Sequence, residues 1–144
     1  MARSALVASS DIEALFERVL SPGGRTLGTA LVDYDAAERV VTLAFVAQPE
    51  FTNILGAVHG GYVAAMLDET AGMAAKLSLP LDKAVPTLDF NTTFLAPAPT
   101  GRLLGRGRVL RLGRRTAFME ALLTTEEEKV LARMTVTALV TDVG

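Results

Sequence analysis

The sequence has no cysteine and only one histidine, His59, among its 144 residues. Without cysteine the chain has no disulfide framework, no thiolate nucleophile and no cysteine-based metal site. A single histidine also excludes a two-histidine zinc site within one chain. We therefore expect no metal ion, and the function predicted below requires no organic cofactor.

A strong net charge is missing as well. The formal net charge is −2, and 50% of the residues are apolar, which argues against a disordered chain and a general nucleic-acid-binding protein. The N-terminus has no basic start followed by a long apolar run, so we expect no signal peptide and a cytoplasmic protein. We expect a single domain over residues 10–144 and a disordered N-terminus over residues 1–9.

A segment between residues 53 and 78 begins with polar and glycine residues and continues with about twenty residues of helical periodicity, apolar on every side. A helix that is apolar all round is a buried one, and this one would span roughly 30 Å. Two adjacent acids, Asp68 and Glu69, lie in its middle, which argues against a membrane span. We therefore predict a long core helix that keeps an acid inside.

Shorter patterns flank this segment. Ser10-Asp11-Ile12-Glu13 has the form of a capping box, and the helical spacing after it is expected to stop at Pro22-Gly23-Gly24. A hairpin is predicted from strands over residues 26–32 and 39–46. Period-two alternation predicts four more strands, over residues 85–94, 101–112, 114–124 and 130–140. The pattern predicts an α+β fold, with an antiparallel six-stranded sheet wrapped around a long central helix and a short N-terminal helix.

The start of the long helix is a candidate catalytic element. Unpaired N–H groups and the helix dipole at Gly60 would stabilise negative charge on a carbonyl oxygen, and Gly60 and Gly61 would let a substrate approach the backbone closely. The alternative is that the two glycines only allow the helix to pack against the sheet. Asn53 can hydrogen-bond the same carbonyl or hold its own loop.

The two acids are the candidates for proton transfer or nucleophilic attack. A desolvated carboxylate has a raised pKa and accepts protons better, which makes Asp68 the candidate base or nucleophile. Glu69 lies about 100° around the helix from Asp68, so we expect that both cannot face one substrate. Glu69 remains the competing acid and, with Gly61, a candidate substrate-binding residue.

Several motifs share their spacing with one family. Asn53 is followed after six residues by His59-Gly60-Gly61, and Asp68 comes nine residues after the histidine. Further matching segments are Thr87-Leu88-Asp89-Phe90-Asn91, Phe94-Leu95-Ala96-Pro97 and Arg111-Leu112-Gly113-Arg114-Arg115. Over residues 25–140 the chain resembles the hotdog-fold acyl-CoA thioesterases of the phenylacetic-acid-pathway type, within the 4-hydroxybenzoyl-CoA thioesterase superfamily.

This resemblance implies a hotdog fold and a dimer as the working unit, often paired into a tetramer. It implies that the acid at Asp68 acts on the substrate and that the hydroxyl of Thr87 can position water. It also implies that His59 supports the loop from Asn53 to Gly60 or contacts the thioester. On its own, Thr87 is nearly as well explained as a strand-favouring residue.

Six of the chain's fourteen basic residues lie within fourteen positions, namely Arg102, Arg106, Arg108, Arg111, Arg114 and Arg115. Arginine forks suit the phosphate groups of coenzyme A, and the candidate contacts are Arg106, Arg108, Arg114 and Arg115. A solvated strand edge is the alternative explanation. The absence of interleaved aromatic residues argues against nucleic acid.

These observations predict an enzyme that hydrolyses an acyl-CoA thioester to a free acid and coenzyme A. The alternatives are a hotdog dehydratase or hydratase, and a non-catalytic acyl-CoA-binding or regulatory module. Gly60 and Asp68 lie about 12 Å apart along one helix. We therefore expect a twofold homodimer, paired into a dimer of dimers, in which the helix start of one chain faces Asp68 of the other. No nucleic acid or membrane is expected as a partner.

Overall fold

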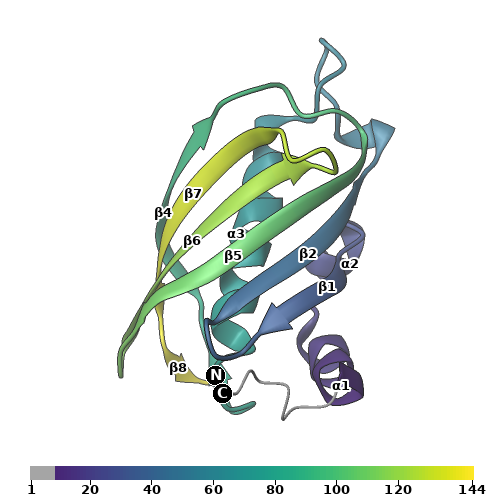
Figure 1. Ribbon diagram of the computed structural model, residues 1–144. Coiled ribbons are helices and arrows are strands. Elements are labelled where there is room, and N and C mark those ends of the chain that lie inside the picture. The colour runs from purple at the N-terminus through teal and green to yellow at the C-terminus, as the bar shows by residue number, and fades with distance from the viewer. Residues whose placement is uncertain (1–8) are drawn as a thin grey trace.

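Residues 9–144 are described by a computed structural model, in which a curved sheet wraps around one long helix (Figure 1). The sheet has six antiparallel strands, and short helices precede it in the chain. The predicted α+β fold, with its central helix, six-stranded sheet and short N-terminal helix, is therefore confirmed. The N-terminus predicted to be disordered lies outside the described residues except for Ser9, and so does the Ser10 side chain of the predicted capping box.

The helices are α1 (Ser9–Val19), α2 (Pro22–Thr26) and α3 (Gly60–Lys76), with a 3-10 turn over Pro49–Phe51. The sheet consists of β1 (Ala30–Asp35), β2 (Val40–Ala47), β4 (Thr87–Phe94), β5 (Gly101–Leu112), β6 (Thr116–Thr125) and β7 (Val130–Leu139). A separate short ribbon pairs β3 (Lys83–Ala84) with β8 (Thr141–Asp142). Every predicted strand boundary except those of the first strand lies within two residues of these.

The predicted stop of the first helix is confirmed, because α1 ends at Val19, before Pro22-Gly23-Gly24. The first strand nevertheless begins later than predicted, because a second short helix follows. Pro22-Gly23-Gly24 opens this helix, α2, and the Ser21 side chain accepts a hydrogen bond from the Gly24 N–H (3.0 Å). Serine is a favoured N-cap, and proline suits the first turn because its missing N–H would have no partner there. The predicted start of the strand at residue 26 is therefore wrong, and β1 begins at Ala30.

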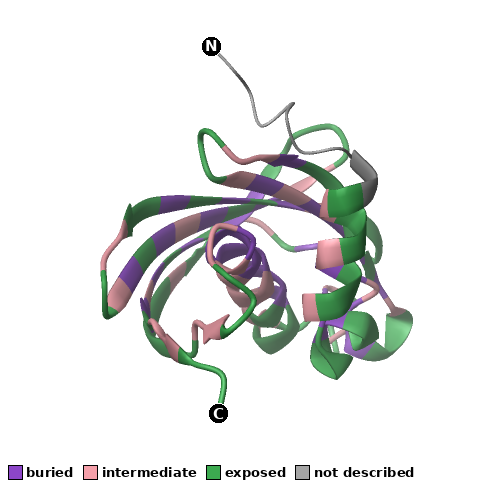
Figure 2. Ribbon diagram, turned by 90° about the horizontal axis from the view of Figure 1, so that it is seen from below, coloured by how far each residue is buried: buried purple, intermediate pink, exposed green. Residues whose placement is uncertain are grey.

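The strand order of the sheet is β1-β2-β5-β6-β7-β4. β4 thus precedes β5 in the chain but lies at an edge of the sheet, and the segment after it crosses back to the middle (Figure 1). α3 lies between β2 and β4 in the chain and fills the concave side of the sheet, as Figure 2 shows from below. No helix between residues 9 and 144 is long and apolar enough to cross a membrane.

α3 lies close to the sheet where β5 carries glycine. A Cβ atom on Gly105 would lie 2.3 Å from Thr70 Oγ1, and one on Gly107 would lie 2.6 Å from the Thr70 carbonyl oxygen. Both glycines therefore face α3, and Thr70 is fully buried, with its hydroxyl donating to the Met66 carbonyl (2.7 Å). Because side chains alternate along a strand, the arginines next to these glycines point to the opposite face of the sheet.

The edge strand β4 leaves apolar side chains uncovered. Leu88, Phe90 and Phe94 are 59%, 43% and 55% exposed, and Leu95 beside them is 55% exposed. β4 has a sheet neighbour on one side only in the described chain, so it presents unpaired backbone groups on the other side. An apolar edge of this kind favours pairing with a second chain.

Candidate active site

Asp68 and Thr87 meet where the middle of α3 lies beside the start of β4. The Thr87 hydroxyl donates a hydrogen bond to Asp68 Oδ1 over 2.8 Å. The pairing of β4 with β7 shifts register between Thr87 and Asp89, at the same point of the strand. The structure thus brings together two predicted catalytic residues that are far apart in the sequence.

A cleft with a volume of about 310 Å³ opens beside this pair. Val19, the last residue of α1, and Ser21, the N-cap of α2, line one side. Val85, Pro86 and Thr87, which lead into β4, line another, and one side of α3 completes the lining. The cleft therefore lies among three segments that are distant in the sequence. The Asp68 carboxylate lines it on the side where α3 contacts β4.

Both acids of α3 line this cleft. The two side chains lie on different parts of the lining, because the cleft follows α3 from Thr87 round to Ser21. That only one of the two acids faces a substrate stays a prediction. Glu69 packs against α2, since a Cβ atom on Gly24 would lie 2.8 Å from Glu69 Oε2. Burial, and secondarily the neighbouring charge of Asp68, raises the pKa of Glu69.

The start of α3 carries the predicted groups for binding a carbonyl oxygen. No backbone carbonyl of the described chain accepts a hydrogen bond from the N–H of Gly60 or Gly61, whereas the Val63 N–H bonds to the His59 carbonyl (3.1 Å). Free N–H groups at the positive end of a helix dipole can stabilise a developing negative charge. A Cβ atom on Gly60 would lie 3.4 Å from the Phe94 ring, at the end of β4.

Asn53 holds the loop that leads into α3. Its side-chain oxygen accepts hydrogen bonds from the N–H groups of Leu55 (2.9 Å) and Ala57 (3.3 Å). The sequence left two roles open for Asn53, to bind a carbonyl oxygen or to hold its own loop. These contacts hold the loop. His59 is exposed, and its side chain makes no capping bond to α3.

The predicted site residues therefore form two groups within one chain. Asp68, Glu69 and Thr87 line the cleft, whereas the residues of the helix start, from Asn53 to Gly61, do not. Eight residues of helix separate Gly60 from Asp68, which corresponds to about 12 Å. Within a single chain, the N–H groups at the start of α3 therefore lie apart from the Asp68 carboxylate.

Comparison with known proteins identifies the family of this chain. The family model described as the thioesterase superfamily matches residues 55–132, which include the helix start, Asp68 and Thr87. The chain belongs to the thioesterase superfamily. The resemblance noted in the sequence is confirmed at this level.

Relatives of this thioesterase-superfamily chain include human acyl-coenzyme A thioesterase 13, which is 32% identical over 114 residues, 77% of this chain and 74% of that protein. A provisionally named esterase from Haemophilus influenzae is 30% identical over 86 residues, which is 58% of this chain. The matched part spans 62% of that relative, less than two thirds of its length. The solved structure of a phenylacetic acid degradation-related protein from Ralstonia eutropha JMP134 is similar with a TM-score of 0.81 and 31% identity, covering 88% of this chain and 96% of that one.

In this member of the thioesterase superfamily the arginine cluster lies apart from the cleft. Arg106 and Arg108 point to the outer face of the sheet, because the glycines next to them face α3. Arg108 pairs with Glu120 of the neighbouring strand (2.8 Å). Arg114 and Arg115 are exposed in the turn between β5 and β6. None of these four arginines lines the cleft beside Asp68.

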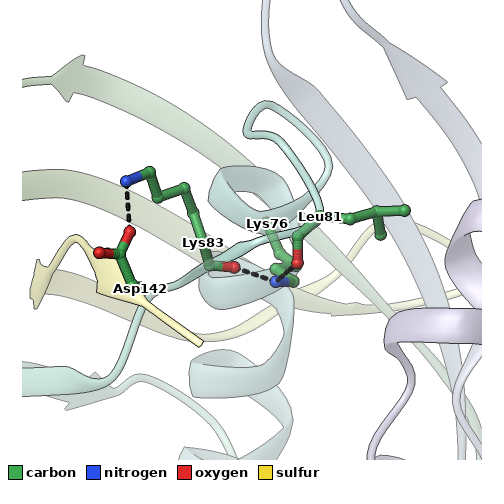
Figure 3. A network of polar contacts seen from close by, with 4 residues as sticks. All are labelled: Lys76, Leu81, Lys83 and Asp142. Carbon is green, nitrogen blue, oxygen red and sulfur yellow. Dashed lines mark hydrogen bonds and ion pairs between the residues drawn. The ribbon is translucent and has the colours of Figure 1, made fainter. Parts of the chain in front are cut away.

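Lys76 also lines the cleft, which the sequence predictions did not include. Its ammonium group donates to the carbonyls of Leu81 (3.5 Å) and Lys83, and the Lys83 side chain pairs with Asp142 (2.5 Å), as Figure 3 shows. These contacts tie the end of α3 to the β3–β8 ribbon. The signal in the sequence was the seven-residue spacing from Glu69 to Lys76, which places both on one helix face.

Glu69 gives the stability of this protein a pH dependence. Its pKa lies above the ordinary 4.5 in the folded protein, so the folded state binds more protons than the unfolded state between the two pKa values. The free energy of unfolding should therefore fall as pH rises through that window. Because Gln stays neutral, Glu69→Gln should be more stable than wild type at about pH 8 and lose this advantage at about pH 4. Urea unfolding over this pH range measures the difference.

Glu127→Gln is the matched control, since Glu127 is exposed in the turn before β7. Its effect on the free energy of unfolding should vary less with pH than that of Glu69→Gln. A difference between wild type and Glu69→Gln that stays constant across the pH range would contradict the assigned burial of this carboxyl group.

Proposed function

We propose that the protein hydrolyses an acyl-CoA thioester to a free acid and coenzyme A. The observation that carries the proposal is the hydrogen bond from Thr87 to Asp68 beside the cleft, in a chain of the thioesterase superfamily. The human relative is named an acyl-coenzyme A thioesterase, which supports acyl-CoA as the class of substrate.

Asp68 is the base or the nucleophile in this proposal. One of its oxygens accepts the hydrogen bond from Thr87, and the other is left for a water molecule or for the substrate. As a base, Asp68 takes a proton from the attacking water, and the sulfur leaves with coenzyme A and is protonated. As a nucleophile, Asp68 forms an anhydride with the acyl group and expels the same thiolate, and water then hydrolyses the anhydride.

The carbonyl oxygen of the thioester is bound by the free N–H groups at the start of α3, at Gly60 and Gly61. Asn53 holds the loop that leads into this end of the helix. The proposed role of His59 is to support the same loop or to contact the thioester. Because about 12 Å of helix separates Gly60 from Asp68, the groups that act on one substrate are supplied by two chains.

The exposed β4 edge supports this arrangement, because it can pair with a second copy of the chain. Antiparallel pairing about a twofold axis places the start of one β4 opposite the end of the other. Thr87 at the start bonds to Asp68, and Phe94 at the end lies against Gly60. Asp68 of one chain thereby comes next to Gly60 of the other, twice in each dimer. The same pairing covers the exposed apolar side chains of β4.

The nucleotide of coenzyme A is proposed to bind the arginine cluster. Arg106, Arg114 and Arg115 form no ion pair in the described chain, so their guanidinium groups are available for phosphate, whereas Arg108 is already paired with Glu120. Assembly of dimers into a tetramer and a cytoplasmic location belong to the same proposal.

A thiol-release assay tests the proposed function. The purified protein is mixed with aryl, short-chain and long-chain acyl-CoA, and free thiol and free acid are measured together. Hydrolysis should release the two in equal amounts for at least one acyl group, and the same acyl group on pantetheine, which lacks the nucleotide, should show a higher KM. Binding of acyl-CoA without release of thiol would reject hydrolysis in favour of a non-catalytic module.

A further inference from the structure

Gly72 lies in α3 one helical turn after Asp68, on the same face of the helix, and lines the cleft. A Cβ atom added to Gly72 would meet nothing within 4 Å beyond its two neighbours in the chain and the adjacent backbone of α3 itself. This distinguishes Gly72 from Gly105 and Gly107, where an added Cβ atom would collide with Thr70. Packing against the sheet therefore does not require glycine at position 72.

Backbone conformation does not require it either. The glycines with positive φ are Gly28, Gly56 and Gly101, whereas Gly72 lies inside the regular helix α3. Glycine in the interior of a helix is about 1 kcal/mol less favourable than alanine. Gly72 thus weakens α3 without relieving a clash or adopting a special conformation, and what it provides is empty space in the cleft beside Asp68.

That space suits the acyl part of a substrate. Val19, Met73 and Val85 supply apolar surface around it, and Lys76, held by the carbonyls of Leu81 and Lys83, also lines the cleft. The volume of about 310 Å³ is at the low end of the roughly 300–1,000 Å³ typical of ligand pockets. A compact apolar group fits within this volume.

We infer that Gly72 is the specificity-determining residue of this cleft. The acyl group extends from the thioester at Asp68 along α3 and over Gly72, and the missing side chain admits a group as broad as an aromatic ring. The inference rests on the proposed thioester hydrolysis and goes beyond it, because it names a compact acyl group as the preferred class and the residue that selects it.

The test is a series of side chains of increasing size at one position. Gly72→Ala, Gly72→Val and Gly72→Leu are assayed with benzoyl-CoA and acetyl-CoA. For benzoyl-CoA, kcat/KM should fall stepwise, by about 10-fold to 100-fold at Leu, the range expected for lost space in an apolar pocket. For acetyl-CoA, kcat/KM should change much less. Ala14→Leu, on the exposed side of α1, controls for added apolar surface.

If the larger side chains prevent folding, kcat/KM can still be compared between wild type and Gly72→Ala. This variant should fold, because alanine favours a helix and should raise the thermal midpoint. Equal losses for the two substrates, or an unchanged preference throughout the series, would overturn the inference.

A binding experiment tests the Gly72 inference separately from the proposed hydrolysis. The ligand is the thioether S-benzyl-CoA, which cannot be hydrolysed as a thioester, and its Kd is measured by titration calorimetry. If the wild type releases no thiol from any acyl-CoA, hydrolysis fails as the function. A Kd for the thioether that rises along the series would still support the Gly72 assignment, and a constant Kd would overturn it.

Discussion

Asp68→Asn should lower kcat for acyl-CoA hydrolysis by about 100-fold to 10,000-fold, the usual contribution of a positioned acid or base. Asparagine keeps the shape of aspartate and can still accept the hydrogen bond from Thr87, but it cannot take a proton from water or attack the thioester. The loss should therefore appear in kcat with little change in KM. Steady-state thiol release measures both constants, and thermal unfolding verifies that the variant is folded.

Glu69→Gln is the matched comparison for Asp68→Asn. It removes the same charge from the next residue of α3, and both carboxylates line the same cleft. Glu69→Gln should lose much less of kcat than Asp68→Asn. Near-normal turnover in Asp68→Asn combined with a large loss in Glu69→Gln would transfer the catalytic role to Glu69.

Much of the fold was predictable because periodicity is a local property of the chain. Helical spacing around Asp68 predicted the buried helix, and alternation along residues 130–140 predicted β7, whose side chains from Ala132 to Ala138 alternate between the core and the outer face. Asp68 and Thr87 were each named as candidates from the sequence, but only the structure shows that they form a hydrogen-bonded pair.

The remaining features depend on which segments pack together, and single-chain patterns do not contain that information. One exception is local: Ser21-Pro22 is itself a signal for the start of a helix, and the prediction of a strand from residue 26 overlooked it. The angle between Asp68 and Glu69 on the helix was correct, but it could not reveal a cleft that extends to Val19 and Ser21. In the same way, Arg108 has no acid nearby in the sequence, yet β5–β6 pairing brings Glu120 opposite it.

Two proteins that are each inactive should recover activity when their subunits mix. One carries Asp68→Asn and lacks the acid. The other carries Gly60→Pro, which removes a free N–H at the first residue of α3, a position where proline is compatible with a helix. In a mixed twofold dimer, one of the two composite sites contains both substitutions and the other contains neither.

The activity of that mixture tests the central claim, that Asp68 of one chain acts on a thioester held by Gly60 of another. The two variants are combined in equal amounts, subunit exchange is verified with differently tagged chains, and thiol release is measured before and after exchange. Random exchange makes half of the dimers mixed, with one intact site of two, so activity should rise to about a quarter of wild type. Verified exchange with no recovery of activity would mean that each site is built within one chain, and the composite site would be wrong.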